Sequence, residues 1–181
     1  MLSPRIIPCL LISDGGLVKT QKFTSKKYVG DPINAIRIFN EKEVDELLVL
    51  DIDASKLKKE PNYSLIEEFA SECFMPLAYG GGITDIKQAS RLFSLGVEKI
   101  VLQTAALQNI ELISELANLY GSQSIMVSLD LKAKWFGKLS LYHAAERRIL
   151  QKPWLEFAQS VVEAGAGEIL LNSVDKDGTL S

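Results

Sequence analysis

Residues 45–53 read DELLVLDID, and a closely similar stretch, GEILLNSVD, returns at residues 167–175. In both stretches a short, uninterrupted apolar run is followed by acidic or amide residues. Apolar runs without polar alternation fit strands that are buried on both faces, as strands of a parallel sheet are. The two stretches therefore predict buried parallel strands, used twice in one chain.

Further elements of the same kind lie on either side of these stretches. Four more apolar runs are predicted as strands, at residues 6–12, 74–78, 99–102 and 124–129. The segments between the strands have helical spacing, and the first of them opens with Asp31-Pro32, a capping carboxylate followed by a proline at the first helical position. The other predicted helices cover residues 64–70, 85–95, 109–120 and 153–164. Strands alternating with helices in this way indicate βαβ units and a mostly parallel sheet.

The repeat has a longer period. Its two copies are about 120 residues apart, and Ile6 to Leu11 lines up with Ile125 to Asp130 at a similar separation. Duplication of this size suggests a barrel built from two similar halves, each with four βα units. A complete eight-unit barrel takes about 200 residues or more, and this chain has 181. We expect an α/β protein whose single domain, residues 1–181, is a (β/α)8 TIM barrel that is C-terminally incomplete, with about six βα units. The stop at Asp177 to Ser181 implies either a fragment of a longer chain or a partner that covers the gap.

Composition excludes several classes of protein. The chain is 47% hydrophobic and 24% charged with a net charge of −3, which argues against a disordered protein and against nucleic-acid binding through a basic surface. No apolar run reaches the roughly 18 residues of a membrane span, and the first apolar run lacks a signal-peptide cleavage site. Cys9 and Cys73 lie in apolar sequence, which predicts buried thiols and a cytoplasmic protein. A single histidine and the absence of a Cys-x-x-Cys motif predict that there is no metal site.

Glycines follow the third predicted strand, at the edge where parallel barrels carry their active sites. Gly80, Gly81 and Gly82 could let backbone N–H groups approach an anion, helped by the positive end of the helix that opens near Asp85. The alternative is a tight turn that binds nothing. Thr104, after the fourth strand, adds a hydroxyl and favours a phosphate-binding cradle.

Carboxylates follow the other strands. Asp130 ends the fifth strand and is a candidate general acid or base, or else a helix cap or salt-bridged group. Its counterpart in the first half of the repeat is Leu11. Acidic residues also follow the second and sixth strands, and they would make the opening at the carboxyl ends of the strands, the mouth of the barrel, acidic. Each could act in catalysis or could be a helix cap or salt-bridged group, as for Asp130: Asp51, Asp53, Asp175 and Asp177.

Two longer connections could cover this mouth. Residues 14–30 carry several lysines and are either a lid over an anionic substrate or a solvated loop. Residues 132–148 alternate in part and predict a hairpin, which either covers the mouth or offers exposed aromatic side chains to a partner. We expect His143 in this hairpin to be structural.

Charged residues stand at the opposite ends of four strands: Arg5, Glu46, Lys99 and Glu168. They either solvate the base of the barrel or pair across it as a closed ring of two cations and two anions.

The motifs taken together are similar to those of one family. Residues 5–10, 14–15, 18–19, 30–32, 80–83, 104–106, 165–171 and 175–179 resemble the cyclase subunit of imidazole glycerol phosphate synthase (HisF-type). The resemblance implies a (β/α)8 barrel of the ribulose-phosphate-binding type that needs no cofactor and sits on a HisH-like glutaminase subunit. In this family ammonia from the glutaminase enters the barrel bottom, passes along its axis and reacts at the top with a phosphorylated ribulosyl intermediate.

The resemblance assigns roles to residues at matching positions. Arg5, Glu46, Lys99 and Glu168 match the salt-bridge gate for ammonia. Gly81, Gly82 and Thr104 match the first phosphate site, and Lys19 matches a substrate-contacting lysine. Asp51 and Asp177 join them as candidate substrate-binding residues. Asp130 matches one of two catalytic aspartates.

The chain also departs from the family pattern. The second catalytic aspartate is replaced by Leu11, which can neither take nor give a proton. Gln103 stands where asparagine is usual, and Asp53 where threonine is usual. The strands that carry the second phosphate site are absent from the sequence. The resemblance thus implies an intact gate with incomplete cyclisation chemistry, and whether the chain is itself an enzyme stays open.

Three functions remain. The first is a paralogue of the kind encoded in surface-polysaccharide gene clusters, which conducts ammonia from a glutaminase to a sugar amidotransferase that makes amidino sugars. The second is a genuine cyclase of histidine biosynthesis, in which Asp51 or a water replaces the missing aspartate. The third is a truncated, non-catalytic barrel that binds phosphate or a partner.

Overall fold

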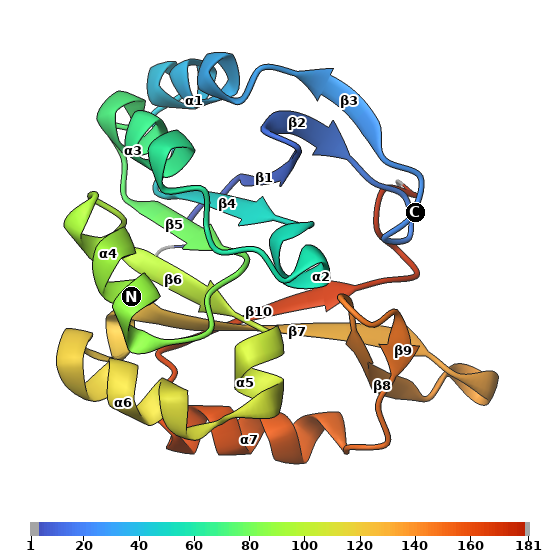
Figure 1. Cartoon of the computed structure of the whole chain (residues 1–181). Coiled ribbons are helices and arrows are strands. Elements are labelled where there is room, and N and C mark those ends of the chain that lie inside the picture. The colour runs from blue at the N-terminus through green and yellow to red at the C-terminus, as the bar shows by residue number, and fades with distance from the viewer. Residues whose placement is uncertain (1–3, 180–181) are drawn as a thin grey trace. The chain divides into compact units, whose positions relative to one another are not determined.

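The computed structural model describes residues 4–179 and divides into two compact units (Figure 1). Unit 1 is the described part of residues 1–18 together with residues 28–100, and unit 2 is residues 19–27 together with the described part of 101–181. The last two residues of the chain lie outside the described residues. The expectation of one domain over the whole chain stays a prediction.

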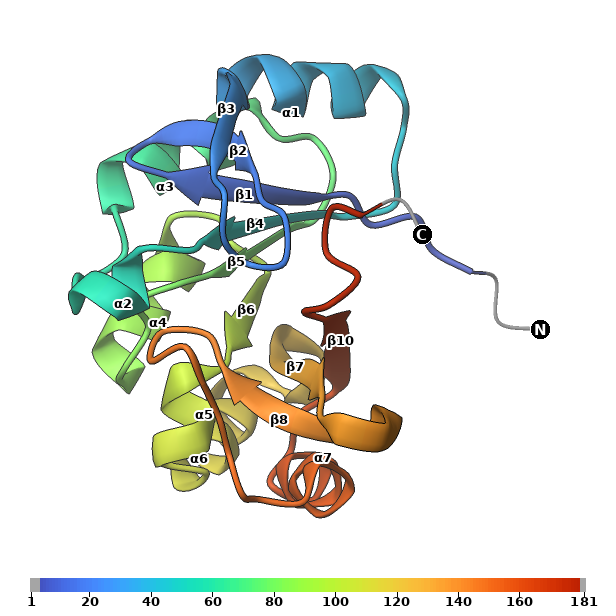
Figure 2. The same cartoon turned by 90° about the vertical axis from the view of Figure 1, so that its right-hand side faces the viewer.

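Unit 1 is built on parallel strands with helices between them. Its elements are β1 (Cys9–Ser13), β2 (Gly16–Lys19), β3 (Lys27–Gly30), α1 (Pro32–Glu41), β4 (Leu47–Asp51), α2 (Ala54–Leu57), α3 (Tyr63–Glu72), β5 (Leu77–Gly80) and α4 (Ile86–Ser94). Strand β4 pairs in parallel with both β1 and β5, and β2 returns antiparallel to β1 (Figure 2). In this register Leu11 lies beside Leu50, and Leu50 beside Gly80.

Side-chain caps fix the helices of unit 1 where the sequence predicts them. Asp31 accepts a hydrogen bond from the Asn34 N–H at 2.9 Å and caps α1, whose first residue is Pro32. Asn62 caps α3 in the same way. The helices bury apolar side chains against the strands, among them Ile36, Ile66, Phe69 and Leu92. These caps and buried faces hold the strand ends of unit 1 in place.

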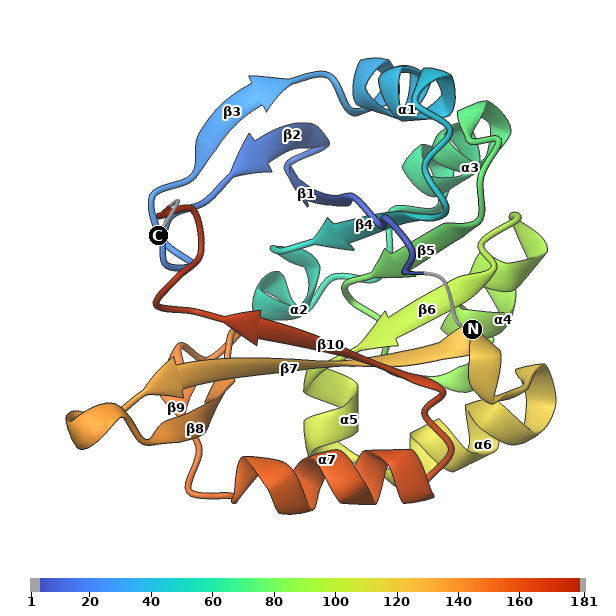
Figure 3. The ribbon, with the colours of Figure 1, turned by 180° about the vertical axis from the view of Figure 1, so that it is seen from behind.

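Strand β6 (Lys99–Leu102) runs across the division between the units. The other elements of unit 2 are α5 (Thr104–Gln108), α6 (Glu111–Tyr120), η1 (Ser122–Ser124), β7 (Ile125–Ala133), η2 (Trp135–Gly137), β8 (Leu139–His143), β9 (Arg148–Ile149), α7 (Trp154–Glu163) and β10 (Glu168–Ser173). Strand β10 pairs in parallel with β7 along its full length, while β8 pairs antiparallel with β7 (Figure 3). Helices α6 and α7 pack on β7 and bury Ile113, Leu116 and Phe157.

The α/β class predicted from the sequence is confirmed, because strands alternate with helices and pair mostly in parallel. Three details differ from the prediction. The first strand starts at Cys9, after Pro8, and the third at Leu77, after Pro76. Residues 14–30 contain strands β2 and β3 where we expected a loop. The short helices α2 and α5 were not predicted.

The prediction that both cysteines are buried was wrong. Cys9 is exposed and Cys73 is half-buried. Cys9 alternates along β1 with Leu10, which is buried, so the apolar surroundings in the sequence belong to the opposite face of the strand. Between residues 4 and 179, no helix combines the length and the apolar character that crossing a membrane requires.

Candidate functional site

Asp130 lies at the centre of a buried polar cluster in unit 2. It is only 4% exposed and is the sixth residue of β7, which runs on to Ala133 and so does not end at Asp130 as predicted. Asn172 is its register partner on β10 and donates a hydrogen bond to Asp130 Oδ1 at 2.9 Å. Gln103 Nε2 donates to the other carboxyl oxygen, and Ser128 Oγ lies 3.4 Å from Oδ1. Parallel pairing of β7 and β10 thus places an amide beside the carboxylate at the carboxyl ends of both strands.

Burial and hydrogen bonding act on Asp130 in opposite directions. Burial raises the pKa of the Asp130 carboxyl above its usual range, while the bonds from Asn172, Gln103 and Ser128 lower that pKa. The negative charge of Asp177 raises the pKa further, and burial is the largest of these effects. A carboxyl group with a raised pKa can hold and release a proton closer to neutral pH. The arrangement therefore suits a general acid or base.

Asp177 organises the segment that contains Lys19. Its Oδ2 accepts hydrogen bonds from Thr20 Oγ1 at 2.8 Å and from the Phe23 N–H at 2.9 Å. The Lys22 N–H donates to the Asp177 carbonyl at 3.0 Å. Lys19 itself is exposed at the end of β2. Asp177, predicted as a substrate-binding residue, holds residues 19–27 in place within unit 2.

The corresponding strand ends of unit 1 are different. Leu11 has apolar register partners, Leu50 on β4 and Val18 on β2. Asp51 Oδ1 accepts hydrogen bonds from the N–H groups of Asp53 and Ala54, at 2.9 Å and 3.0 Å, and so closes the turn into α2. This part of unit 1 therefore holds a leucine surrounded by leucine and valine, with a carboxylate engaged in a turn nearby.

Asp53 has a partner on another strand. Its Oδ2 accepts a 2.6 Å hydrogen bond from Ser13 Oγ at the end of β1. This bond joins two strand ends of unit 1. Asp53 is therefore a polar group at the carboxyl ends of the strands, with its carboxylate oriented by a serine.

The glycines after β5 are required by packing. A Cβ on Gly81 would lie 2.5 Å from the Asp51 carbonyl oxygen, and one on Gly82 would lie 2.5 Å from the Lys59 carbonyl oxygen. The Gly82 N–H donates to Ser55 Oγ at 3.2 Å. Close backbone approach thus explains both glycines without a ligand, and phosphate binding here stays a prediction.

The start of the following helix is capped by side chains of the protein itself, and its predicted help in binding an anion stays a prediction. The first turn of α4 is capped by Asp85, which accepts from the Gln88 N–H at 2.9 Å, and Gln88 Oε1 accepts from the Thr84 N–H at 2.7 Å. This reciprocal arrangement engages the Thr84 and Gln88 N–H groups within the protein and puts a carboxylate at the helix start. Thr104, the other predicted phosphate ligand, begins α5 in unit 2.

A buried ion-pair cluster lies at the amino-terminal ends of the strands in unit 1. Lys99 Nζ is 2.8 Å from Glu46 Oε1 and 2.9 Å from Oε2, and Arg5 Nη1 is 3.1 Å from Glu46 Oε2. Glu46 and Lys99 are buried, whereas Arg5 is exposed. Three of the four charged residues predicted to form a ring are thus brought together. The fourth, Glu168, begins β10 in unit 2.

Some site residues were missed by sequence reasoning. Asn172 and Ser128 both contact Asp130, and Ser13 orients Asp53. The repeat places residues 167–175 as a strand, but only its register with β7 shows that Asn172 faces Asp130. His143 is buried, and its Nδ1 accepts a hydrogen bond from the Glu146 N–H at 3.0 Å. Over the described residues, no three His, Cys, Asp or Glu side chains form a group that could hold a metal ion.

Comparison with known proteins shows which family the chain matches. Residues 5–181 match the family described as "Histidine biosynthesis protein". The chain is 57% identical over 178 residues to "Putative imidazole glycerol phosphate synthase subunit hisF2" of Pseudomonas aeruginosa, covering 98% of this chain and 71% of that protein.

Two further relatives have lower sequence identity to the chain. A protein of Leptospira borgpetersenii, "Putative imidazole glycerol phosphate synthase subunit HisF", is 52% identical over 99% of this chain and 71% of its own length. "Imidazole glycerol phosphate synthase subunit HisF" of Streptococcus sanguinis is 37% identical over 100% of this chain and 72% of its own length. Because the family match spans almost the whole chain, it confirms the predicted (β/α)8 barrel class.

Proposed function

Because the chain belongs to the histidine biosynthesis protein family, with relatives named as the HisF subunit of imidazole glycerol phosphate synthase, we propose that it is a HisF-like subunit which conducts ammonia for another enzyme. In this proposal a HisH-like glutaminase releases ammonia at the end of the strands where Glu46 and Lys99 lie. The ammonia leaves at the carboxyl ends of the strands and serves a sugar amidotransferase of surface-polysaccharide synthesis.

The single observation that carries this proposal is Leu11. It occupies the position of one of the two family aspartates that exchange protons during ring closure. Its register partners Leu50 and Val18 are apolar as well. General acid–base catalysis contributes about 10²–10⁴-fold to a rate, so the loss of one of two such groups leaves the cyclisation chemistry weak.

Neighbouring carboxylates are poorly suited to replace the missing aspartate. Asp51 Oδ1 is occupied by two backbone N–H groups of the turn into α2. Asp53 Oδ2 accepts the Ser13 hydroxyl at 2.6 Å. Each of these carboxylates already holds a turn or a strand end in place, and that structural role competes with a role in proton transfer.

The charged cluster supports a role in ammonia uptake. Glu46 is 2% exposed and Lys99 is 8% exposed, and both carboxyl oxygens of Glu46 accept from Lys99. A buried ion pair of this kind is a weak source of stability compared with apolar packing. Retention of the pair where the catalytic aspartate is lost favours a function at this end of the strands.

The names of the relatives are in keeping with this proposal. Among those reported above, the two that share more than half of their residues with the chain carry qualified names, and one of them is numbered as a second copy. The relative named without qualification shares 37%. A second copy in an organism is free to lose the cyclase chemistry.

The second candidate is a cyclase of histidine biosynthesis. It is favoured by the buried Asp130 and the hydrogen bonds from Gln103 and Asn172 that orient its carboxyl group. The third candidate is a barrel without catalysis that binds phosphate or a partner. It would show neither cyclase turnover nor ammonia supply to an amidotransferase.

Cyclase turnover with free ammonium separates the candidates, because ammonium bypasses the glutaminase. The full-length gene product is compared with its Leu11→Asp variant and with Leu11→Asn, which has nearly the shape of aspartate but transfers no proton. We expect no turnover in the natural protein and a gain with Leu11→Asp alone. Turnover of the natural protein equal to that of Leu11→Asp would establish the cyclase function instead.

A further inference from the structure

The β7–β8 hairpin extends unit 2 beyond the Asp130 cluster. Strand β7 continues three residues past Asp130, and its pairing with β8 matches Leu131 with Leu141 and Ala133 with Leu139. The tip, residues 134–138, is closed by a 2.8 Å hydrogen bond from the Lys134 N–H to the Lys138 carbonyl. The hairpin is thus a paired structure that begins at the carboxyl end of the strand carrying Asp130 (Figure 3).

The tip presents an aromatic side chain to solvent. Trp135 is 89% exposed, and Leu139 just after the tip is also exposed. Lys134 and Lys138 flank Trp135 on both sides. Tryptophan is normally among the more buried residues, and it is enriched at the centres of protein interfaces. An indole held in water on a closed turn therefore has the character of a binding anchor.

Positive charge is concentrated in two sequence segments of unit 2, one of which contains the tip, and the carboxylates of Asp175 and Asp177 contact these segments. The two segments 19–27 and 132–152 carry ten basic residues and one acidic residue, Glu146, in a chain whose net charge is −3. The basic residues are Lys19, Lys22, Lys26, Lys27, Lys132, Lys134, Lys138, Arg147, Arg148 and Lys152.

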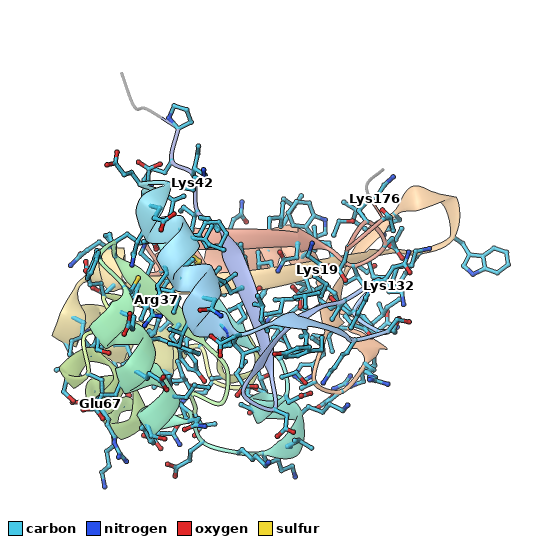
Figure 4. The ribbon with its side chains drawn as sticks, turned by 90° about the horizontal axis from the view of Figure 1, so that it is seen from above. Lys19, Arg37, Lys42, Glu67, Lys132 and Lys176 are labelled. Atoms are coloured by element: carbon cyan, nitrogen blue, oxygen red, sulfur yellow. The ribbon has the colours of Figure 1, made fainter. Side chains whose placement is uncertain are left out.

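The two basic segments lie together. The Phe23 and Tyr142 rings meet edge to face with their centres 6.4 Å apart, and Lys132 Nζ lies 5.1 Å from the centre of the Tyr142 ring. Lys19 and Lys132 accordingly lie at the same end of unit 2, near Lys176 (Figure 4). Concentrated charge of one sign attracts a surface of the opposite sign and speeds its association.

From these observations we propose that the tip, residues 134–138, and the lysines around it form the docking surface for an acidic face of the ammonia-consuming enzyme. This inference rests on the proposed function. Ammonia that escapes into water at neutral pH is protonated and loses its nucleophilic lone pair, so a conduit is effective only if its exit is covered by the acceptor. Trp135 supplies the anchor, and the lysines steer the partner and fix its orientation.

A protein partner fits the surface better than a lipid bilayer does. Among the tip residues whose side chains the structure describes, the exposed apolar group is the Trp135 indole, and Leu139 beside the tip is partly exposed. Stable membrane binding needs a larger buried apolar face or a lipid anchor in addition to basic charge. One aromatic anchor on a closed turn, ringed by charge, is sufficient for a protein–protein hot spot.

The test uses the full-length gene product with a HisH-like glutaminase and with a sugar amidotransferase that makes amidino sugars. The affinity of the amidotransferase for the immobilised subunit is measured at 50 and 200 mM salt (about a two-fold change in Debye length). Product formation by the amidotransferase is then measured with glutamine and, separately, with ammonium. The variants are Trp135→Ala and the double variant Lys134→Glu/Lys138→Glu. Matched controls are Leu119→Ala, an exposed leucine of α6, and Lys42→Glu/Lys87→Glu on exposed lysines of unit 1.

We expect both tip variants to weaken the affinity at least tenfold and to lower glutamine-dependent product formation, with ammonium-dependent product formation and both controls unchanged. The natural subunit should bind more weakly at the higher salt. The inference would be overturned if both tip variants kept the affinity and the glutamine-dependent product formation of the natural subunit. Binding to vesicles of anionic lipid that is lost in the tip variants while affinity for the amidotransferase persists would overturn it as well. If the natural complex makes no glutamine-dependent product, the proposed function fails, and the affinity comparison still decides whether the tip docks this enzyme.

Discussion

Lys99 Nζ lies within 2.9 Å of both carboxyl oxygens of Glu46, and the two side chains are 10% and 3% exposed. Lys99 begins β6 and Glu46 immediately precedes β4, so each is placed at the amino-terminal end of a strand. Arg5 reaches the same carboxylate from a more exposed position. The pair is therefore a buried charge pair in which each member compensates the charge of the other.

Removing one member of this pair should be more harmful than removing both. Lys99→Met leaves the Glu46 carboxylate buried with only Arg5 as partner, and we expect a loss of about 3–5 kcal/mol in the free energy of unfolding. The double variant Glu46→Leu/Lys99→Met should recover most of this loss, because the buried carboxylate is removed together with the buried ammonium, and Arg5, which loses its contact with Glu46, is exposed. Urea unfolding of all variants measures both effects.

Arg37→Met is the matched control for this cycle. Arg37 pairs with Glu72 at 3.1 Å on the surface of unit 1, where both side chains are well exposed (Figure 4). Exposed pairs contribute little to stability because water screens them, so the control should unfold almost as the natural protein does. Equal losses in the free energy of unfolding for Lys99→Met and for the double variant would contradict the expectation. They would mean that the Glu46 carboxylate left behind in Lys99→Met does not destabilise the protein.

Asp130 should make the stability of the protein depend on pH. Burial raises the pKa of its carboxyl in the folded state, so the folded protein binds this proton more tightly than the unfolded chain. The resulting stabilisation is complete below the unfolded pKa of about 3.9 and is lost as pH rises through the folded pKa. At pH 7 Asp130→Asn removes the cost of burying an ionised carboxylate. The variant should therefore be more stable by about 1 kcal/mol, or about 2–4 °C in melting temperature.

Thermal melts of the natural protein and of Asp130→Asn at several pH values between 4 and 8 test this prediction. The difference between the two proteins should grow as pH rises and then level off. A variant that is less stable than the natural protein at pH 7 would mean that the bonds from Gln103 and Asn172 outweigh the effect of burial.

Sequence periodicity predicted the long elements because their signals are local. The apolar runs of β4, β6 and β10 and the capped start of α1 at Asp31 lie where the sequence places them. Helices α2 and α5 were missed because four or five residues do not complete a helical pattern. Residues 16–19 and 27–30 form strands through pairing and packing with other parts of the chain. The local sequence pattern does not reveal these contacts.

Site geometry was predictable only in part, for a similar reason. The spacing of Asp130 at a strand end marked it as a candidate, and Arg5, Glu46 and Lys99 were placed at the opposite ends. The contact between Asn172 and Asp130 depends on the register of β10 against β7, and a shift of one residue would break it. Exposure of Cys9 depends on which face of β1 is covered, and composition says nothing of that.

Gly82 should tolerate a methyl group far less well than Gly137. Both have φ of +74°, so alanine pays a similar backbone penalty of about 1–2 kcal/mol at either position. A Cβ on Gly82 would lie 2.5 Å from the Lys59 carbonyl, whereas nothing lies within 4 Å of one on Gly137. We expect Gly82→Ala to lose about 1–3 kcal/mol more than Gly137→Ala, measured by urea unfolding. Similar losses would show that the loop containing Lys59 yields freely.

Asp177 should control the accessibility of residues 19–27 to protease. Its carboxylate accepts hydrogen bonds from Thr20 Oγ1 and the Phe23 N–H, at 2.8 Å and 2.9 Å. Asp177→Ala removes both bonds, so the segment should open more often and trypsin should cleave after Lys22 and Lys26 several-fold faster. Asp175→Ala is the matched control, because the Asp175 carboxylate accepts from the Ala133 N–H on β7 instead.

Peptide mapping of the first cleavage products, with time, distinguishes local opening from global unfolding. Local opening predicts early cuts confined to residues 19–27 in Asp177→Ala, while Asp175→Ala keeps the natural rate at these lysines. Equal acceleration at Lys22 in both variants would instead assign the effect to general loss of stability at the carboxyl end of β10. Cleavage of Asp177→Ala at the natural rate would mean that the bond from the Lys22 N–H to the Asp177 carbonyl, which the substitution retains, is enough to hold the segment.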